Sequence, residues 1–127
     1  MPVKTKRIYD KPEPGDGCRV LVMRYWPRGI SKDKVDVWEK ELGTQPDLIK
    51  LWKSEAISWS EFAQRYRQAV ASQKEKIKAL AQRAAKDTVT LLCSCPDERR
   101  CHRILLKELI DKALLSPEEG GTRASRA

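Results

Sequence analysis

One short stretch of this 127-residue chain gathers the residue types that carry out metal and thiol chemistry. The stretch LLCSCPDERRCHRILL, at residues 91–106, holds three of the four cysteines and the only histidine, with three arginines in the same turn. These residues are Cys93, Cys95, Cys101 and His102, with Arg99, Arg100 and Arg103. Thiolates and imidazoles bind zinc or attack electrophiles, and guanidinium groups bind anions. The stretch therefore indicates a metal site, a reactive thiol beside an anion pocket, or a Cys-rich core.

The spacing C-x-C-x5-C-H argues against one shared metal ion. Cys101 and His102 are adjacent where a helix is predicted, so their side chains are expected to diverge by about 100°. Cys18 opens a predicted strand whereas Cys93 closes one, which separates them by roughly 20 Å in a parallel sheet. We therefore expect no metal and no other cofactor. A site made of Cys93, Cys95 and one of Cys101 or His102 stays open as an alternative.

A nucleophilic thiol has more physical support. Cys93 and Arg99 form a C-x5-R pattern between a predicted strand and a predicted helix, and thiol phosphatases and sulfurtransferases use that layout to hold an oxyanion. Arg99, Arg103 and the amides of the helix N-terminus would stabilise a thiolate. Cys93 is therefore the candidate nucleophile and His102 the candidate proton carrier. Against this interpretation, the loop has no glycine and Pro96 removes one amide donor.

An anion-binding site needs the fewest assumptions. Cations are disfavoured at the positive end of a helix, so three arginines and a histidine in a first turn indicate negative charge nearby. Asp97 and Glu98 supply part of that charge, and a bound phosphate or carboxylate would supply the rest. The segment RYWPRG brings further cations, and its Trp26 either covers the core or stacks on a planar ligand. The candidate anion-binding residues are Arg24, Trp26, Arg28, Arg99 and Arg103.

Three short apolar runs are predicted to be the strands that position these residues. They are Val3–Tyr9, Cys18–Met23 and Thr88–Cys93. The second and third are nearly continuous Val and Leu, which is typical of central strands covered on both faces in a parallel sheet. Because ligand sites form beyond the carboxyl ends of such strands, we expect RYWPRG and SCPDERRCHR to meet at one edge of the sheet.

The segment between the second and third strands has a helical period. One helix is expected to open near Thr44. Ser58 and Glu61 form a capping box for the next helix, and the spacing of apolar residues in Ile77–Ala84 predicts another. A last helix is expected from about Arg99 to Leu114.

Strands that alternate with helices predict an α/β fold, with a small, mostly parallel sheet flanked by helices in Rossmann-like layering. We expect a single domain over residues 1–115. The tail at residues 116–127 has no apolar residue larger than alanine and is expected to be disordered.

The formal net charge of +8 favours anionic partners. A small phosphate or nucleotide-like ligand is the first expectation, and nucleic acid bound through the basic surface is the second. No run of about 18 apolar residues indicates a membrane span, and the start of the chain lacks the apolar segment of a signal peptide. We therefore expect a cytoplasmic protein with reduced thiols and no membrane partner; the oligomeric state stays open.

Three segments carry a resemblance to a known family. They are RVLVMRYWPRGISKDKVDVWEKELG, LIKLWKSEAISWSEFAQRYRQAV and TVTLLCSCPDERRCHRILLKELI. In this order they resemble the YeaO-like branch of the domain-of-unknown-function family 488 (DUF488), and the resemblance extends from Val3 to about Leu114. It implies a small α/β protein of prokaryotic type and brings no reaction with it. The position of Cys95 is often acidic in relatives, so a site built on that thiol would not be a family property.

Three functional hypotheses follow, from different classes. The favoured one is a binder or Cys-dependent enzyme for a small phosphorylated or nucleotide-like ligand. The second is a nucleic-acid-associated basic protein, which would show a steep dependence of affinity on salt. The third is a thiol redox or metal-responsive protein that uses Cys93, Cys95 and Cys101.

Overall fold

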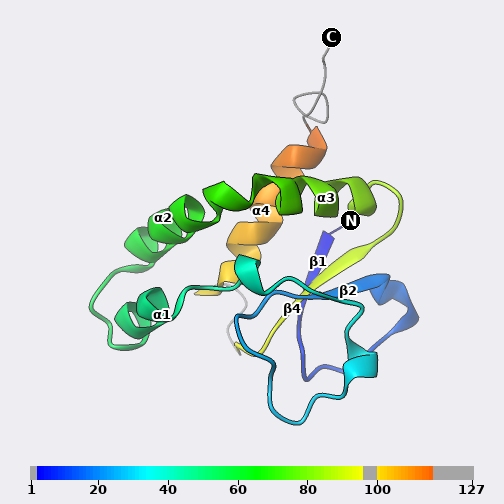
Figure 1. Ribbon diagram of the computed structural model, residues 1–127, viewed down its shortest axis with the longest axis horizontal. Coiled ribbons are helices and arrows are strands. Elements are labelled where there is room, and N and C mark those ends of the chain that lie inside the picture. The colour runs from blue at the N-terminus through cyan, green and yellow to red at the C-terminus, as the bar shows by residue number, and fades with distance from the viewer. Residues whose placement is uncertain (1–2, 96–99, 116–127) are drawn as a thin grey trace.

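A computed structural model describes residues 3–95 and 100–115 of the chain. Four parallel strands form one sheet in the order β1-β4-β2-β3 (Figure 1). Their bounds are Val3–Arg7 for β1, Cys18–Leu21 for β2, Val37–Trp38 for β3 and Val89–Cys93 for β4. The three expected strands are confirmed, and β3 is an additional edge strand too short for its residue pattern to have indicated it.

Four α-helices connect and cover these strands. They are α1 at Pro46–Lys53, α2 at Trp59–Val70, α3 at Lys74–Ala84 and α4 at His102–Leu115. Short 3-10 helices lie at Pro14–Asp16, Lys32–Lys34, Lys40–Leu42 and Ala71–Gln73. The predicted cap of α2 is confirmed, because Ser58 Oγ accepts a hydrogen bond from the Glu61 backbone N–H at 3.1 Å. Helix α4 begins at His102 rather than near Arg99.

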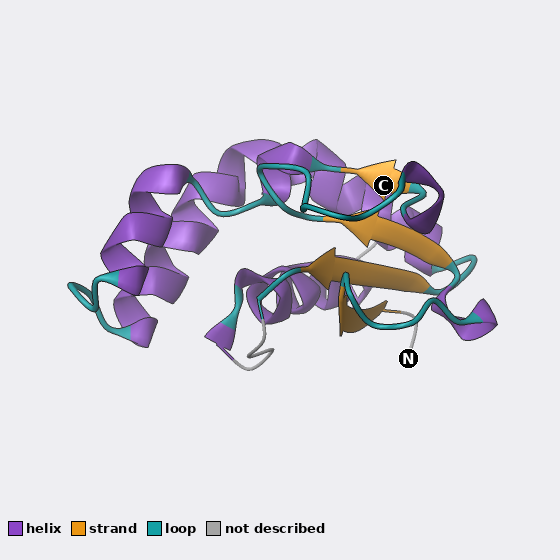
Figure 2. Ribbon diagram, turned by 90° about the horizontal axis from the view of Figure 1, so that it is seen from below, coloured by secondary structure: helices purple, strands orange, loops and turns teal. Residues whose placement is uncertain are grey.

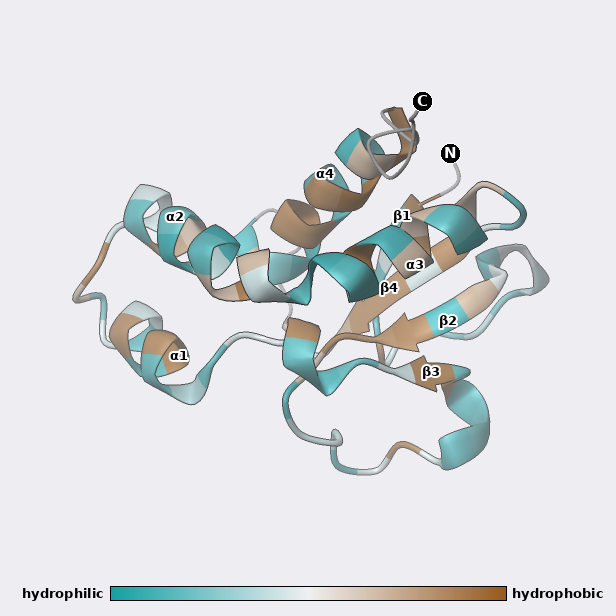
Figure 3. Ribbon diagram, turned by 45° about the horizontal axis from the view of Figure 1, so that its top comes forward, coloured by the Kyte–Doolittle hydropathy of each residue, from teal (hydrophilic) through white to brown (hydrophobic). Residues whose placement is uncertain are grey.

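The two faces of the sheet are covered differently. On one face α3 and α4 pack directly against the strands, α2 packs against α4, and α1 packs against α2 (Figure 1 and Figure 2). Residues of all four helices belong to the same main core as strand residues such as Val20, Val89 and Leu91. On the other face, Ile8, Leu21 and Leu92 form a small second core. That core is covered by the loop after β2, through Met23, Trp26, Ile30 and Val35. Both faces of the central strands are therefore buried, as the continuous apolar runs of β2 and β4 predict (Figure 3).

Strand register brings three carboxyl ends to one edge of the sheet. Strand β4 lies between β1 and β2, with Arg7 opposite Cys93 on one side and Leu21 opposite Leu92 on the other. The segments that follow β2 and β4 therefore start at the same edge of the sheet, as predicted, and residues 96–99 of the second segment lie outside the described residues.

A buried carboxylate, Asp16, holds the segment that precedes β2 in place. Asp16 accepts hydrogen bonds from Lys6 Nζ at 3.1 Å, from Arg19 Nη1 at 2.5 Å and from the backbone N–H of Glu13 at 3.1 Å. Burial by itself raises the pKa of Asp16, but these hydrogen bonds outweigh it and lower the pKa to about 2. The backbone carbonyl of Asp16 accepts from Thr90 Oγ1 on β4, so this network ties the start of β2 to the centre of the sheet.

Within residues 3–95 and 100–115, no helix has the length and apolar character needed to cross a lipid bilayer.

Candidate functional site

The end of β4 and the start of α4 bring two thiols and an imidazole into one buried cluster. Cys93 is the last residue of β4, Cys101 directly precedes α4, and His102 is the first residue of that helix. One ligand atom from each of the three lies within 4.8 Å of the others, and all three side chains are buried. We call these three residues the Cys-Cys-His cluster.

Cys101 and His102 point at the same place, so the expectation that their side chains diverge was wrong. Cys101 Sγ lies 3.6 Å from His102 Nδ1. The reason is that Cys101 occupies the N-cap of α4, outside the helix. Its carbonyl accepts from the Ile104 backbone N–H at 3.1 Å, and its sulfur accepts from the Arg103 backbone N–H. The 100° rotation between helical neighbours therefore does not apply to it.

The imidazole of His102 is held by a backbone carbonyl. Its Nε2 lies 2.5 Å from the carbonyl oxygen of Val22, and because a carbonyl only accepts, Nε2 carries a hydrogen. That assignment leaves Nδ1 facing Cys101, where it accepts the thiol proton in the neutral ring and donates to the thiolate in the imidazolium. Tyr66 packs against the ring, with centroids 5.5 Å apart, and its own hydroxyl donates to the Leu42 carbonyl at 2.7 Å.

Arg103 fastens the cluster to the sheet. Its guanidinium is fully buried, and its Nε donates to Cys101 Sγ at 3.3 Å. Its Nη1 donates to the Lys6 carbonyl on β1 at 2.6 Å, and its Nη2 donates to the Cys95 carbonyl at 2.7 Å. Arg103 was expected to bind an external anion, but these hydrogen bonds join it to the protein itself.

The two thiols of the cluster titrate in opposite directions. A hydrogen bond from the Cys93 thiol lowers the pKa of Cys101, burial opposes this, and His102 and the Arg103 backbone N–H lower it further. The same hydrogen bond raises the pKa of Cys93, and burial raises it again. Cys101 is therefore the more acidic thiol of the pair, whereas the C-x5-R pattern singles out Cys93.

Two arginines flank the cluster on the helix-covered side of the sheet. Arg7 pairs with Cys93 in the β1–β4 register, and by strand alternation it shares the face of Val3 in the main core. Arg24 donates from Nη2 to the Gly43 carbonyl at 3.2 Å and lies close enough to Tyr66 to act on its pKa. The Nε atoms of both arginines are buried and have no hydrogen-bond partner within the described part of the chain.

Arg7 is absent from the residues that the sequence indicated. The only feature that could have indicated Arg7 is its position at the end of β1, because the neighbouring parallel strand β4 ends at Cys93. That neighbour becomes known only with the strand order β1-β4-β2-β3.

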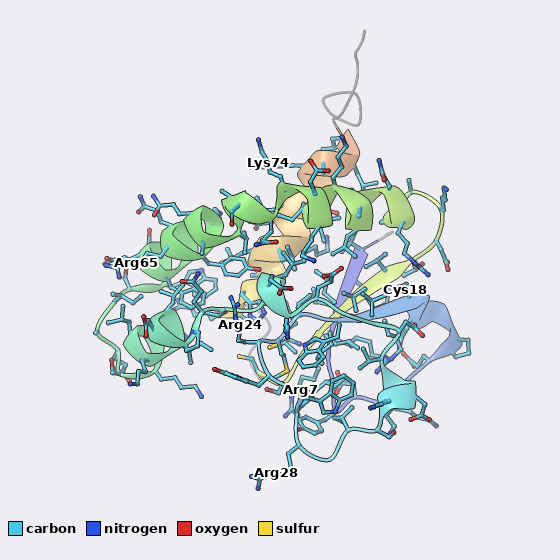
Figure 4. All side chains as sticks on the ribbon, in the orientation of Figure 1. Arg7, Cys18, Arg24, Arg28, Arg65 and Lys74 are labelled. Carbon is cyan, nitrogen blue, oxygen red and sulfur yellow. The ribbon has the colours of Figure 1, made fainter. Side chains whose placement is uncertain are left out.

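Trp26 and Arg28 do not join the cluster. The indole of Trp26 packs on the second core, across the sheet from the helices, and its Nε1 donates to the Ile30 carbonyl at 2.8 Å. It meets Trp38 edge-on at 5.4 Å, and both rings line a surface groove with Lys32 and neighbouring residues. The side chain of Arg28 is exposed and projects from the periphery of the molecule, away from Arg24 and Arg7 (Figure 4).

The remaining expected residues have simpler places. Cys18 lies at the opposite end of the sheet from Cys93, as predicted, where it pairs with Val89 and is buried in the main core. Burial raises the pKa of its thiol. Cys95 is half-buried in the segment after β4. The prediction for Arg99 and that for the tail at residues 116–127 fall outside the described residues.

The cluster also has the donor set of a zinc site. Two sulfurs and one nitrogen within 4.8 Å of one another match the ligand types of tetrahedral zinc. In such sites a ligating histidine commonly donates its other N–H to a carbonyl, as His102 does to Val22. The same three side chains can therefore act as thiol machinery or as three ligands of one soft divalent ion.

The chain is similar to a family of bacterial proteins over nearly all of its described length. It matches the DUF488-N3a family, described as the active DUF488-N3 subclade, over residues 3–114. It is 36% identical over 110 residues to the uncharacterised protein YeaO of Escherichia coli K12, a match that covers 85% of this chain and 96% of YeaO. It is 30% identical over 111 residues to the uncharacterised protein Rv3073c of Mycobacterium tuberculosis H37Rv, covering 86% and 93%. No solved structure matches the chain significantly.

Proposed function

This chain belongs to the DUF488-N3a family, the active DUF488-N3 subclade, and from that premise we propose that it is a Cys-dependent enzyme acting on a small anionic substrate. In this proposal Cys101 is the nucleophile, His102 carries the proton, and Arg7 and Arg24 bind the negative charge of the substrate. The observation that carries the proposal is the position of Cys101 Sγ, between His102 Nδ1 at 3.6 Å and Arg103 Nε at 3.3 Å.

The arrangement meets the requirements for an activated nucleophile. A nucleophilic thiol needs a base within reach and a third group that orients the base. His102 is that base, and the Val22 carbonyl orients it through Nε2. Because Cys101 is also the N-cap of α4, the helix dipole and the Arg103 backbone N–H stabilise its thiolate.

The chemical step transfers a group to water through a covalent intermediate. The Cys101 thiolate attacks an electrophilic centre of the substrate, a sulfur bond to that centre forms, and the bond to the leaving group breaks. The leaving group takes the Nδ1 proton of the His102 imidazolium. In the second step His102 removes a proton from water, and the hydroxide displaces the thiolate. Both steps balance with water as the second substrate.

The anionic character of the substrate rests on Arg7 and Arg24. A buried guanidinium nitrogen that lacks an acceptor destabilises the fold by about 1–3 kcal/mol, so such donors call for a partner. Both unpartnered Nε atoms belong to residues at the sheet edge where the cluster lies. A phosphate or carboxylate group would accept from them and place the rest of the substrate against Cys101.

A pair of alkylating reagents tests nucleophile and anion preference together. Iodoacetamide and iodoacetate alkylate thiolates by the same displacement of iodide, but only iodoacetate carries a negative charge. We expect Cys101 to be the fastest-labelled thiol in reduced protein under nitrogen, as located by peptide mass spectrometry. The ratio of the iodoacetate rate to the iodoacetamide rate should fall roughly tenfold in Arg24→Gln and in Arg7→Gln. Arg28→Gln is the matched control, because that side chain is exposed and projects away from Arg24 and Arg7 (Figure 4).

Two results would reject the proposal. If Cys93 or Cys95 is labelled faster than Cys101, the nucleophile is misassigned. If the rate ratio is the same in wild type, Arg7→Gln and Arg24→Gln, these arginines do not form an anion site. Circular dichroism of each variant identifies any that fail to fold.

A further inference from the structure

The two thiols of the Cys-Cys-His cluster lie close together, a relationship that the proposed group transfer does not use. Their Sγ atoms lie within 4.8 Å of each other. Both side chains are at least 94% buried, since 6% of Cys93 and 4% of Cys101 remain exposed. A disulfide needs a sulfur–sulfur distance of about 2 Å, so a shift of at most about 3 Å would join them.

We propose that Cys93 and Cys101 form a redox pair that reduces small hydroperoxides, with Cys101 as the attacking thiolate and Cys93 as the thiol that closes the disulfide. This activity goes beyond the proposed function, because it is an oxidation–reduction reaction and not the transfer of a substrate group to water. It also narrows the thiol redox hypothesis that the sequence indicates, since that hypothesis names Cys93, Cys95 and Cys101 without choosing a pair.

The first step consumes the peroxide. The Cys101 thiolate attacks the terminal oxygen of the hydroperoxide, a sulfur–oxygen bond forms, and the oxygen–oxygen bond breaks. The departing alkoxide, or hydroxide if the oxidant is hydrogen peroxide, takes the Nδ1 proton of the His102 imidazolium. Cys101 is thereby oxidised by two electrons to a sulfenic acid, and the peroxide is reduced to an alcohol or to water.

The second step closes the disulfide. The sulfur of Cys93 attacks the sulfur of the Cys101 sulfenic acid, and hydroxide leaves with the proton of the Cys93 thiol as water. The net reaction converts two thiols and one hydroperoxide into one disulfide, one alcohol and one water. A dithiol reductant restores both thiols by exchange and is itself oxidised to a disulfide.

The surroundings of the pair favour this chemistry over irreversible oxidation. Arg103 Nε and His102 Nδ1 both face Cys101 Sγ, so the charge on the attacking sulfur and on the departing oxygen is stabilised. The resolving thiol lies within 4.8 Å of the sulfur that becomes oxidised. Because both sulfurs are buried, small oxidants reach them more readily than bulky ones.

Thiol counting and disulfide mapping test the pair directly. Untagged, fully reduced protein is desalted under nitrogen, treated with one equivalent of hydrogen peroxide and quenched with N-ethylmaleimide. We expect the number of free thiols to fall from the four of the sequence to two, with the mass of the unlabelled protein lowered by two hydrogens. Peptide mapping should find Cys93 linked to Cys101, and dithiothreitol should restore all four thiols.

Variants separate the roles of the four cysteines. Cys18→Ser and Cys95→Ser should form the same disulfide as the wild type, because neither sulfur belongs to the cluster. Cys93→Ser should stop at a sulfenic acid on Cys101, trapped by dimedone, and Cys101→Ser should consume no peroxide at this stoichiometry. If Cys93→Ser does not fold, as judged by circular dichroism, peptide mapping of the wild type alone decides.

Several outcomes would overturn the redox pair. They are a Cys93–Cys95 link, a link between two chains, four thiols unchanged while free cysteine is oxidised in the same tube, and one equivalent of zinc in the purified protein that blocks oxidation. The alkylation test of the proposed function is run without oxidant, so the two proposals can fail independently. Cys101 can be the fastest-alkylated thiol without reacting with peroxide, and it can react with peroxide without being the fastest-alkylated thiol.

Discussion

The Nη1 atom of Arg103 lies 2.6 Å from the carbonyl oxygen of Lys6, so a residue of the last helix is joined to the edge strand β1. The same guanidinium reaches the Cys95 carbonyl and the Cys101 sulfur. Strand β1, the segment after β4 and the start of α4 therefore all contact one buried guanidinium. These hydrogen bonds hold the sulfur of Cys101 at the carboxyl edge of the sheet.

Replacement of Arg103 by lysine should destabilise the fold. Lysine keeps the charge but lacks the planar fork that serves two carbonyls and a sulfur at once. We expect Arg103→Lys to lower the free energy of unfolding by about 2–4 kcal/mol. The lysine ammonium would leave at least one of the buried acceptors of Arg103 without a donor, and its own charge would be incompletely hydrogen-bonded. Urea denaturation followed by circular dichroism measures this. Arg100→Lys, on an exposed side chain in the same turn, is the control and should change it by less than about 0.5 kcal/mol.

Replacement of His102 by glutamine should distinguish the roles of the two imidazole nitrogens. The glutamine amide can still donate to the Val22 carbonyl, but it places no group at the Nδ1 position beside Cys101. We expect His102→Gln to raise the pKa of Cys101 and to slow its alkylation by iodoacetamide at pH 6 roughly tenfold. The melting temperature should stay close to that of the wild type. An unchanged alkylation rate would show that His102 has no part in activating the thiol.

The buried carboxylate of Asp16 should make stability depend on acid. Its pKa is about 2 in the folded protein, below the value of 3.8 for an unperturbed group. A depressed pKa contributes stability above the unfolded value, and this contribution is lost as pH falls from about 4 to about 2. Its size is about 2 kcal/mol. Asp16→Asn should therefore be less stable than wild type at pH 7, with the difference shrinking at pH 3 in urea denaturation.

Glu75→Gln is the control for that measurement, since it removes an exposed carboxylate from α3. It should leave the pH dependence unchanged. A gap between wild type and Asp16→Asn that is as large at pH 3 as at pH 7 would contradict the assignment of the acid sensitivity to Asp16.

Two glycines with positive φ should respond very differently to alanine. Gly17 has φ of 62°, and a Cβ there would lie 2.2 Å from the carbonyl oxygen of Thr88. Gly29 has φ of 80°, but a Cβ there meets no atom within 4 Å. Gly29→Ala should cost about 1 kcal/mol from backbone strain alone. Gly17→Ala adds a clash with the backbone beside β4 and should cost more than about 2 kcal/mol. Equal melting temperatures for the two variants would contradict this packing.

Local patterns were sufficient to predict most of the fold. The apolar runs of β2 and β4 identify buried parallel strands, and Ser58 with Glu61 marks the start of α2. These features depend on residues close together in the chain, so the sequence alone carries them. The meeting of the segments after β2 and β4 at one edge also followed, because parallel strands share a direction.

The composition of the site depended on contacts between distant segments. Arg24 and Trp26 were expected in one anion site because both belong to the segment RYWPRG that follows β2. The chain instead bends at Arg24 and Tyr25, so Arg24 lies with Gly43 on the helix side and Trp26 lies against the second core.

The sequence by itself determined that this is a parallel α/β domain with thiols, an imidazole and arginines near one edge of its sheet. Only the tertiary structure decided which of them meet. Helix α4 begins at His102, so Cys101 lies outside the helix and its sulfur turns toward both Nδ1 and Cys93. Strand order decided that Arg7 stands beside Cys93. Helix starts and strand order are set by packing across the whole core, and no local spacing of residues encodes them.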